Sequence, residues 1–116
     1  MFKTGIFAVT SVAVVAGMAT FFSGAHISRA DTDARILYMT HCGGCCHGPE
    51  GKPTDLGAAL EARDFTDAAW QAKTTDEQII KQINYGTPEK MKPFKEELTP
   101  DEIKSLVPVV RSFGKK

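Results

Sequence analysis

The sequence predicts an all-α fold, and three observations support this prediction. Residues 103–110 place apolar side chains along one face of a helix with the spacing of successive helical turns. Residues 79–83 repeat this spacing over a shorter run that contains three isoleucines. No segment alternates apolar and polar residues for long enough to predict a strand.

Residues 1–30 are predicted to be a signal peptide, and residues 31–116 to be one small domain. Lys3 precedes an apolar stretch over residues 6–22, and small residues surround a cleavage point after Ala30. The apolar stretch is long enough that an uncleaved membrane anchor is the alternative. We therefore expect an exported, periplasmic protein, with a membrane-anchored form as the alternative.

The composition of the predicted domain limits what it can bind. Over residues 31–116 the acidic residues exceed the basic ones by two, which does not favour a nucleic-acid partner. A single domain of this size has a modest apolar core, and such domains commonly depend on a cofactor for stability.

The first predicted helix runs over residues 35–39 and ends at a cysteine-rich loop. Asp31 and Thr32 are the candidate N-terminal caps, because short polar side chains accept from the free backbone N–H groups of a helix start. Its apolar side is expected to contain Ile36, Leu37 and Tyr38.

The middle of the chain is predicted to contain a loop followed by a helix. Residues 47–56 are rich in glycine, proline and charge, which is typical of a loop. Short helical turns are expected over residues 58–62 and 65–70. A longer helix begins where Thr74 and Glu77 fit a capping box, and Gly86 is expected to end it.

The last predicted helix has the clearest start in the chain. Thr99 is a good N-cap, Pro100 suits the first turn, and Glu102 fits the capping position. Its apolar stripe is formed by Ile103, Leu106, Val107 and Val110. Pro108 lies in mid-helix, where it removes a hydrogen bond at a cost of about 3 kcal/mol, so a kink or break is expected there.

All three cysteines and two of the three histidines lie in residues 41–48. Cys46 and His47 are adjacent, and Cys42 precedes them in a C-x-x-x-C-H arrangement. A c-type haem is attached by two such thiols, which add to the porphyrin vinyl groups, while the imidazole next to the second thiol binds the iron. The sequence therefore predicts one covalently bound haem c, although the usual motif has one residue fewer between its cysteines.

Attachment through Cys42 and Cys46 is expected, because this pair keeps His47 in register as an iron ligand. The two glycines of the loop can absorb the extra residue, since glycine tolerates unusual backbone dihedrals. The alternatives are attachment that involves Cys45, or a single thioether bond.

Three other functions of the cysteine cluster fit less well. A structural zinc site needs four ligands, usually as two separated pairs, and no second pair follows. A thioredoxin-like site needs a βαβ pattern around it, and the sequence shows no such pattern. A disulfide between Cys42 and Cys45 would close a very small loop and stabilise little.

Met91 is predicted to be the second axial ligand of the iron. It lies in a proline-containing loop between the last two predicted helices. A methionine sulfur opposite a histidine raises the reduction potential, which suits an electron carrier. The alternatives are that Met91 is a packing residue and that the position is taken by water or His41, or is open.

With these residues placed, the chain resembles the small single-haem class I cytochromes c of bacteria. The resemblance covers almost all of residues 31–116, including the stretch over residues 57–60 and the ending over residues 106–113. It implies several helices wrapped around haem, with the first and last helices crossing. It also implies His47 and Met91 as axial ligands and one-electron transfer at a partly exposed haem edge.

The expected function is therefore electron transfer between redox partner proteins, without catalysis by the chain itself. The alternatives are a gas-binding or sensory haem protein, which needs a weak or absent Met91 bond, and a haem subunit of a larger redox complex. Lys90, Lys92 and Lys95 are candidates for a basic patch that docks an acidic partner, or are charges of a solvated loop.

Overall fold

The structure is a computed structural model that describes residues 13, 17 and 28–115. Within these ranges the elements are α1 (Arg29–Tyr38), the π-helix η1 (Met39–Gly43), α2 (Asp55–Ala59), α3 (Ala68–Lys73), α4 (Asp76–Tyr85) and α5 (Pro100–Ser112). The β-structure of the described part is limited to an isolated bridge between Thr87 and Met91. The predicted all-α fold is confirmed.

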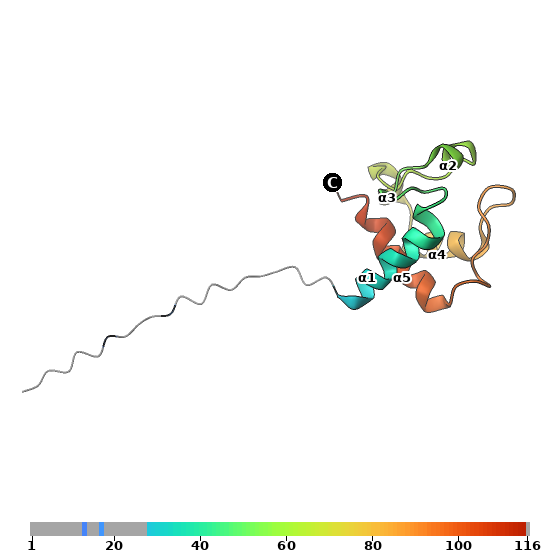
Figure 1. Ribbon diagram of the computed structural model, residues 1–116. Helices are drawn as coiled ribbons and strands as arrows, with labels where there is room; N and C mark the ends of the chain where they lie inside the picture. The colour runs from blue at the N-terminus through green and yellow to red at the C-terminus, as the bar shows by residue number, and fades with distance from the viewer. Residues whose placement is uncertain (1–12, 14–16, 18–27, 116) are drawn as a thin grey trace, which may run out of the picture.

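Helix α1 crosses α5, which also packs against α4 (Figure 1). The least exposed large side chains of the described part are Tyr38 of α1 and Ile103 and Leu106 of α5. The buried side chains of α5 are Ile103, Leu106, Val107, Val109 and Val110. The predicted apolar stripe and the crossing of the first and last helices are therefore confirmed.

Helix α1 begins earlier than predicted. Its N-cap is Ser28, whose side chain accepts from the backbone N–H of Asp31, while the Asp31 carboxylate accepts from the backbone of Ser28. The prediction that Asp31 and Thr32 cap the helix is wrong, because Ser28 already satisfies the free donors of the first turn.

The buried side of α1 also differs from the prediction. Ala34 and Tyr38, one helical turn apart, are buried, and Leu37 is half-buried. Ile36 is 60% exposed, so it does not contribute to the core as expected.

The predicted signal peptide, residues 1–30, lies mostly outside the described residues. Its last residues are described, and α1 already begins at Arg29, so the predicted cleavage point after Ala30 falls in the first turn of this helix. Among the described residues, we find no helix with the length and apolar character that a membrane span requires.

Helix α4 is capped one residue later than predicted. The capping box is formed by Thr75 and Gln78, and the side chain of each accepts a hydrogen bond from the backbone N–H of the other. The predicted pair of Thr74 and Glu77 is wrong, because Thr74 ends α3. Gly86 ends α4 as predicted, with a φ of 61° that favours glycine.

The two short helices are shifted from their predicted positions by their caps. Helix α2 begins earlier than predicted because the side chain of Thr54 accepts from Gly57 N. Helix α3 begins later because the side chain of Asp67 accepts from the backbone N–H groups of Ala69 and Trp70.

Helix α5 continues through Pro108, so the predicted break is wrong. Pro108 and Lys104 are both exposed. The Lys104 carbonyl, which would accept from residue 108 in an unbroken ladder, therefore lies on the solvent side, where water can replace the missing donor.

Candidate haem site

The backbone from Met39 to His47 contains turns that are wider than those of an α-helix. Gly44 N donates to Met39 O at 3.1 Å, and His47 N donates to Cys42 O at 3.2 Å. Both hydrogen bonds span five residues instead of the four of an α-helix, which is the pattern of a π-helix. Cys42 thus lies within η1, and Cys46 and His47 follow it after Gly44 and Cys45.

The glycines of the loop allow close packing and do not adopt unusual dihedrals. Gly44 has an ordinary φ of −86°. A Cβ on buried Gly43 would lie 2.8 Å from the Tyr38 ring and 2.9 Å from Met39 Sδ. The expectation that these glycines supply special dihedrals is corrected: Gly43 is needed because a side chain would not fit.

The three thiols have different surroundings. Cys42 is half-buried against the core, Cys46 is half-buried and Cys45 is exposed, with the Sγ atoms of Cys45 and Cys46 3.2 Å apart. Burial, with a smaller contribution from the Cys46 thiol, raises the pKa of Cys42 to about 11. The hydrogen bond with Cys45 raises the pKa of Cys46. Both pKa shifts are upward, opposite to the shift that activates the thiols of thiol–disulfide enzymes.

The His47 ring is enclosed on one side. It stacks on Phe65 with ring centroids 4.4 Å apart and planes 17° apart. Its Nδ1 is buried and has no hydrogen-bond partner of good geometry among the described residues. Burial lowers the pKa of His47, and the nearby backbone of Arg63 opposes this shift. Burial therefore favours the neutral imidazole, the form that binds iron, and enclosure of Nδ1 leaves Nε2 for a metal.

The ring of Phe65 also contacts two other aromatic rings, those of Trp70 and Phe113, and the three form an aromatic cluster. The Trp70 centroid lies 5.3 Å from that of Phe65, and the Phe113 centroid lies 6.4 Å away. Phe113 in turn contacts Tyr38 at 5.1 Å, and the buried Tyr38 hydroxyl donates to Gly48 O at 2.8 Å. The orientation of His47 is thus coupled to the crossing of α1 and α5.

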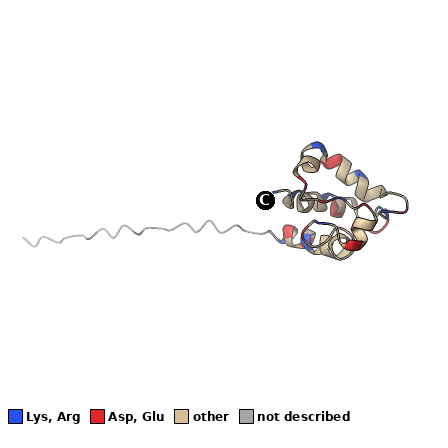
Figure 2. Cartoon of the chain, turned by 90° about the horizontal axis from the view of Figure 1, so that it is seen from above, with Lys and Arg blue, Asp and Glu red and all other residues tan. Residues whose placement is uncertain are grey.

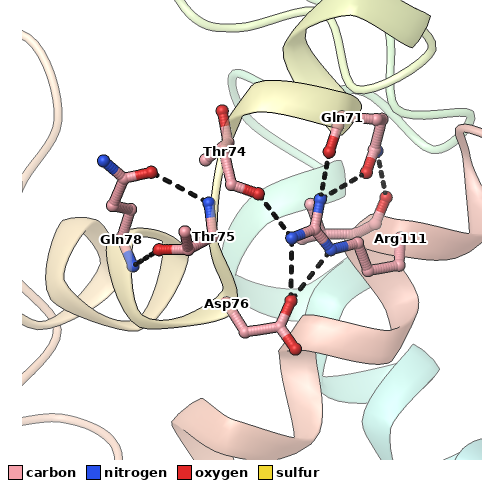
Figure 3. A network of polar contacts seen from close by, with 7 residues as sticks. Gln71, Thr74, Thr75, Asp76, Gln78 and Arg111 are labelled. Carbon is pink, nitrogen blue, oxygen red and sulfur yellow. Dashed lines mark hydrogen bonds and ion pairs between the residues drawn. The ribbon is translucent and has the colours of Figure 1, made fainter.

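Arg111 of α5 connects this cluster to the turn between α3 and α4 (Figure 3). Its guanidinium donates to Gln71 O at 2.8 Å, to Thr74 O at 2.6 Å and to Asp76 Oδ1 at 2.9 Å. The Gln71 amide then donates to Phe65 O at 2.8 Å. Arg111 therefore helps to fix the backbone of the residue on which His47 stacks.

Helix α2 lies directly against the cysteine loop. Thr54 N donates to Cys46 O at 2.9 Å, and the Thr54 hydroxyl donates to Cys45 O at 2.7 Å. A Cβ on Gly57 would lie only 1.8 Å from Cys46 O. The backbone of Cys46 is thus fixed immediately before His47.

Met91 lies in a tight turn over residues 86–93, named here the methionine hairpin. Thr87 N donates to Met91 O at 2.8 Å, and Met91 N donates to Thr87 O at 2.9 Å. A Cβ on Gly86 would lie 2.1 Å from Met91 O. The Gln82 side chain of α4 donates to Thr87 Oγ1 at 2.8 Å and contacts Met91 Sδ at 3.5 Å.

The hairpin and the cysteine loop border the same core. Met91 and Cys42 both pack against the buried core cluster, and Lys90 forms an ion pair with Glu61 beyond α2. Met91 also lines a hollow of about 490 Å³, whose other lining residues are Tyr85 and members of the hairpin. The structure therefore brings the cysteines and His47 together and places Met91 on a separate segment at the same core.

His41, an alternative ligand in the sequence analysis, packs elsewhere. Its ring meets Phe94 edge-on with centroids 5.9 Å apart, and its Nδ1 lies 4.0 Å from Glu97 Oε2. Through these contacts His41 packs against the segment that follows the hairpin.

Two of the three lysines proposed for docking are ion-paired. Lys90 pairs with Glu61, and Lys92 pairs with Glu97 at 2.8 Å. Lys95 instead lies over an aromatic ring, at 5.5 Å from its centroid. Acidic and basic residues are interspersed over the described helices and loops (Figure 2). The local positive charge is therefore smaller than three lysines would give.

Sequence reasoning missed Thr54, Gly57, Gln82 and Arg111 as residues that support the site. Only Thr54 carried a local signal. Threonine is a typical N-cap residue, whose side chain accepts a hydrogen bond from the backbone N–H three residues later. The other three act through contacts between segments that the sequence does not place together.

The donor set of this site fits a c-type haem, and comparison with known proteins agrees. Residues 29–108 match the family described as cytochrome C oxidase, cbb3-type, subunit III. The structure is similar to the KustC0563 c-type cytochrome, with a TM-score of 0.67 and 65% identity over 69% of this chain and 95% of that chain. A tyrosine-to-phenylalanine mutant of Kustc0563 matches with a TM-score of 0.67 and 64% identity, over 70% and 98% of the two chains. No curated protein matches the chain. The chain therefore belongs to this family of c-type cytochromes, whose haem c is covalently bound.

Proposed function

We propose that the chain is an exported electron carrier of the periplasm that holds one haem c. The observation that carries the proposal is the cysteine loop, which places two half-buried thiols and a neutral, enclosed imidazole next to one another. The chain contains a single cysteine–histidine cluster, which supports one haem. When bound, haem c supplies an iron that accepts and releases one electron.

We assign Cys42 and Cys46 as the attachment residues, and His47 Nε2 and Met91 Sδ as the axial ligands. The π-helix supports this choice, because it absorbs the extra residue before Cys46 and keeps His47 next to it. The stacked ring of Phe65 orients the imidazole, and the hydrogen-bonded hairpin orients the sulfur. With both ligands held by the fold, electron transfer needs little movement of the protein.

Replacing Cys46 with serine is expected to leave at most one thioether bond, whereas Cys45→Ser is expected to keep both. Peptide mass spectrometry of protein matured with a cytochrome-assembly system counts the bonds, and the spectrum of the alkaline pyridine adduct reports the remaining vinyl groups. Two thioethers in the Cys46→Ser protein would show that Cys45 is an attachment residue. Wild-type protein without a Soret band would contradict the proposed function itself.

A second candidate function is that of a haem subunit within a larger redox complex. The description of the matching family as an oxidase subunit favours it. Purification from the native cells distinguishes the two functions, because a carrier is recovered as a free chain and a subunit is recovered with its partners at fixed stoichiometry.

We also propose that redox partners dock at the lysines of the methionine hairpin region, mainly through Lys95. The charges of Lys90 and Lys92 are offset by carboxylates, whereas Lys95 contacts the exposed ring of Tyr85. Exposed charges of this kind act mainly on the rate of association and are screened by salt.

The Lys95→Glu protein is expected to be oxidised several-fold more slowly by hexacyanoferrate(III), an anionic one-electron reagent, at low ionic strength. The difference should shrink at high salt. Lys104→Glu, an exposed change of the same charge on α5, is the control. Equal rates for the two variants would show that Lys95 does not steer anionic partners.

A further inference from the structure

The side chain of Gln82 faces the sulfur of Met91 from the last turn of α4. Its Nε2 lies 3.5 Å from Met91 Sδ and 2.8 Å from Thr87 Oγ1. A thioether sulfur accepts hydrogen bonds and cannot donate them, so the nitrogen of the amide must face it. The second N–H of the same amide then donates to the Thr87 hydroxyl oxygen, and this hydrogen bond fixes the orientation of the Gln82 amide.

The position of this amide relative to the sulfur is set by the backbone. Gly86 N donates to Gln82 O at 2.7 Å, which joins the helix end to the hairpin. Thr87 and Met91 exchange backbone hydrogen bonds across the hairpin. Gln82 is thus bound to the hairpin by both its main chain and its side chain, and the contact with the sulfur follows from the fold.

We propose that Gln82 is a positioning residue that raises the reduction potential by donating a hydrogen bond to Met91 Sδ; this inference depends on the proposed role of Met91 as an iron ligand. A thioether sulfur has two lone pairs, of which one can bind iron while the other accepts from Gln82. Donation from the amide draws electron density from the sulfur and makes it a poorer donor to iron. Ferric iron loses more from this than ferrous iron, so the one-electron reduction becomes more favourable, and no proton is transferred.

Three variants of the haem-loaded protein test the inference. Gln82→Leu keeps a similar volume without a donor, Thr87→Val removes only the other acceptor of the amide, and Lys81→Leu is an exposed control on the same helix. The readouts are the equilibrium with a redox mediator, the methionine–iron charge-transfer band of the ferric protein and the methyl proton resonance of Met91 in the ferrous protein. Gln82→Leu is expected to reduce the equilibrium constant for reduction roughly two- to tenfold, the range of one lost neutral hydrogen bond. Both spectroscopic signals should also shift.

The outcomes separate this inference from the function on which it rests. Wild-type protein that lacks the methionine–iron signals would overturn both the ligand assignment and the role of Gln82. Wild-type protein with these signals, together with a Gln82→Leu variant that behaves like Lys81→Leu, would overturn the role of Gln82 alone. A Thr87→Val variant that changes the potential as much as Gln82→Leu would assign the effect to the hairpin and not to the N–H···S contact.

Discussion

Replacing Gly57 with alanine is expected to destabilise the protein by about 3 kcal/mol and to reduce the yield of attached haem, because it forces α2 away from the cysteine loop. The new Cβ would lie 1.8 Å from Cys46 O and 2.7 Å from Cys46 C. Both are backbone atoms, so no side-chain rotation can relieve the overlap. Any adjustment must move Cys46, and His47 with it, and must also stretch the hydrogen bond from Thr54 N to Cys46 O.

The neighbouring change Ala58→Gly provides the control for this prediction. Ala58 is exposed on the same helix, and its replacement with glycine should cost about 1 kcal/mol through helix propensity alone. Denaturant unfolding of the haem-loaded proteins gives the stabilities, and the pyridine adduct gives the haem content per chain. If the Gly57→Ala protein has the same stability and the same haem content as the Ala58→Gly protein, α2 can move away from the cysteine loop without disturbing the site.

The parts of the fold that could be predicted from the sequence are those with strong local signals. Helix α5 combines Thr99 as a cap, Pro100 in the first turn and an apolar stripe, and the structure confirms all three. The end of α4 at Gly86 is similar, because only glycine adopts the required φ at little cost.

The parts that could not be predicted are those in which neighbouring residues compete for one role. Thr74 and Thr75 are equally good caps by residue type, and the position of α3 decides that Thr74 ends it and Thr75 begins α4. The π-helix likewise depends on Tyr38 and the space at Gly43, which no periodicity reveals.

For the site, the sequence predicts the residues that carry the chemistry better than those that hold them in place. Cysteines next to a histidine, and a methionine in a proline-containing loop, are local patterns. The contact of Gln82 with Met91 and the ion pair of Lys90 with Glu61 join residues that only the folded backbone brings together. Polar residues on exposed helix turns and loops give no sequence signal for such contacts.

The Arg111→Ala protein is expected to be less stable by about 2–4 kcal/mol, because Arg111 satisfies partly buried carbonyl groups of a different part of the chain. The carbonyls of Gln71 and Thr74 would lose their donor, and Asp76 would lose its ion-pair partner at 2.8 Å. The cost comes mainly from the carbonyls that remain without a donor, since an exposed ion pair alone contributes little.

The effect of Arg111→Ala should extend to the haem site, because the Gln71 side chain, whose nitrogen donates to Phe65 O and Val110 O, loses the Arg111 N–H that its oxygen accepts. Looser stacking under His47 is expected to broaden the Soret band and to speed carbon monoxide binding to the reduced protein. Arg111→Lys should recover little stability, since an ammonium cannot reproduce the planar fork of donors that reaches Gln71, Thr74 and Asp76 together. Lys104→Ala, an exposed change on the same helix, should alter stability by less than about 0.5 kcal/mol. If urea unfolding gives Arg111→Ala and Lys104→Ala the same stability, the network does not hold α3 against α5, and the support of Phe65 must come from the aromatic cluster alone.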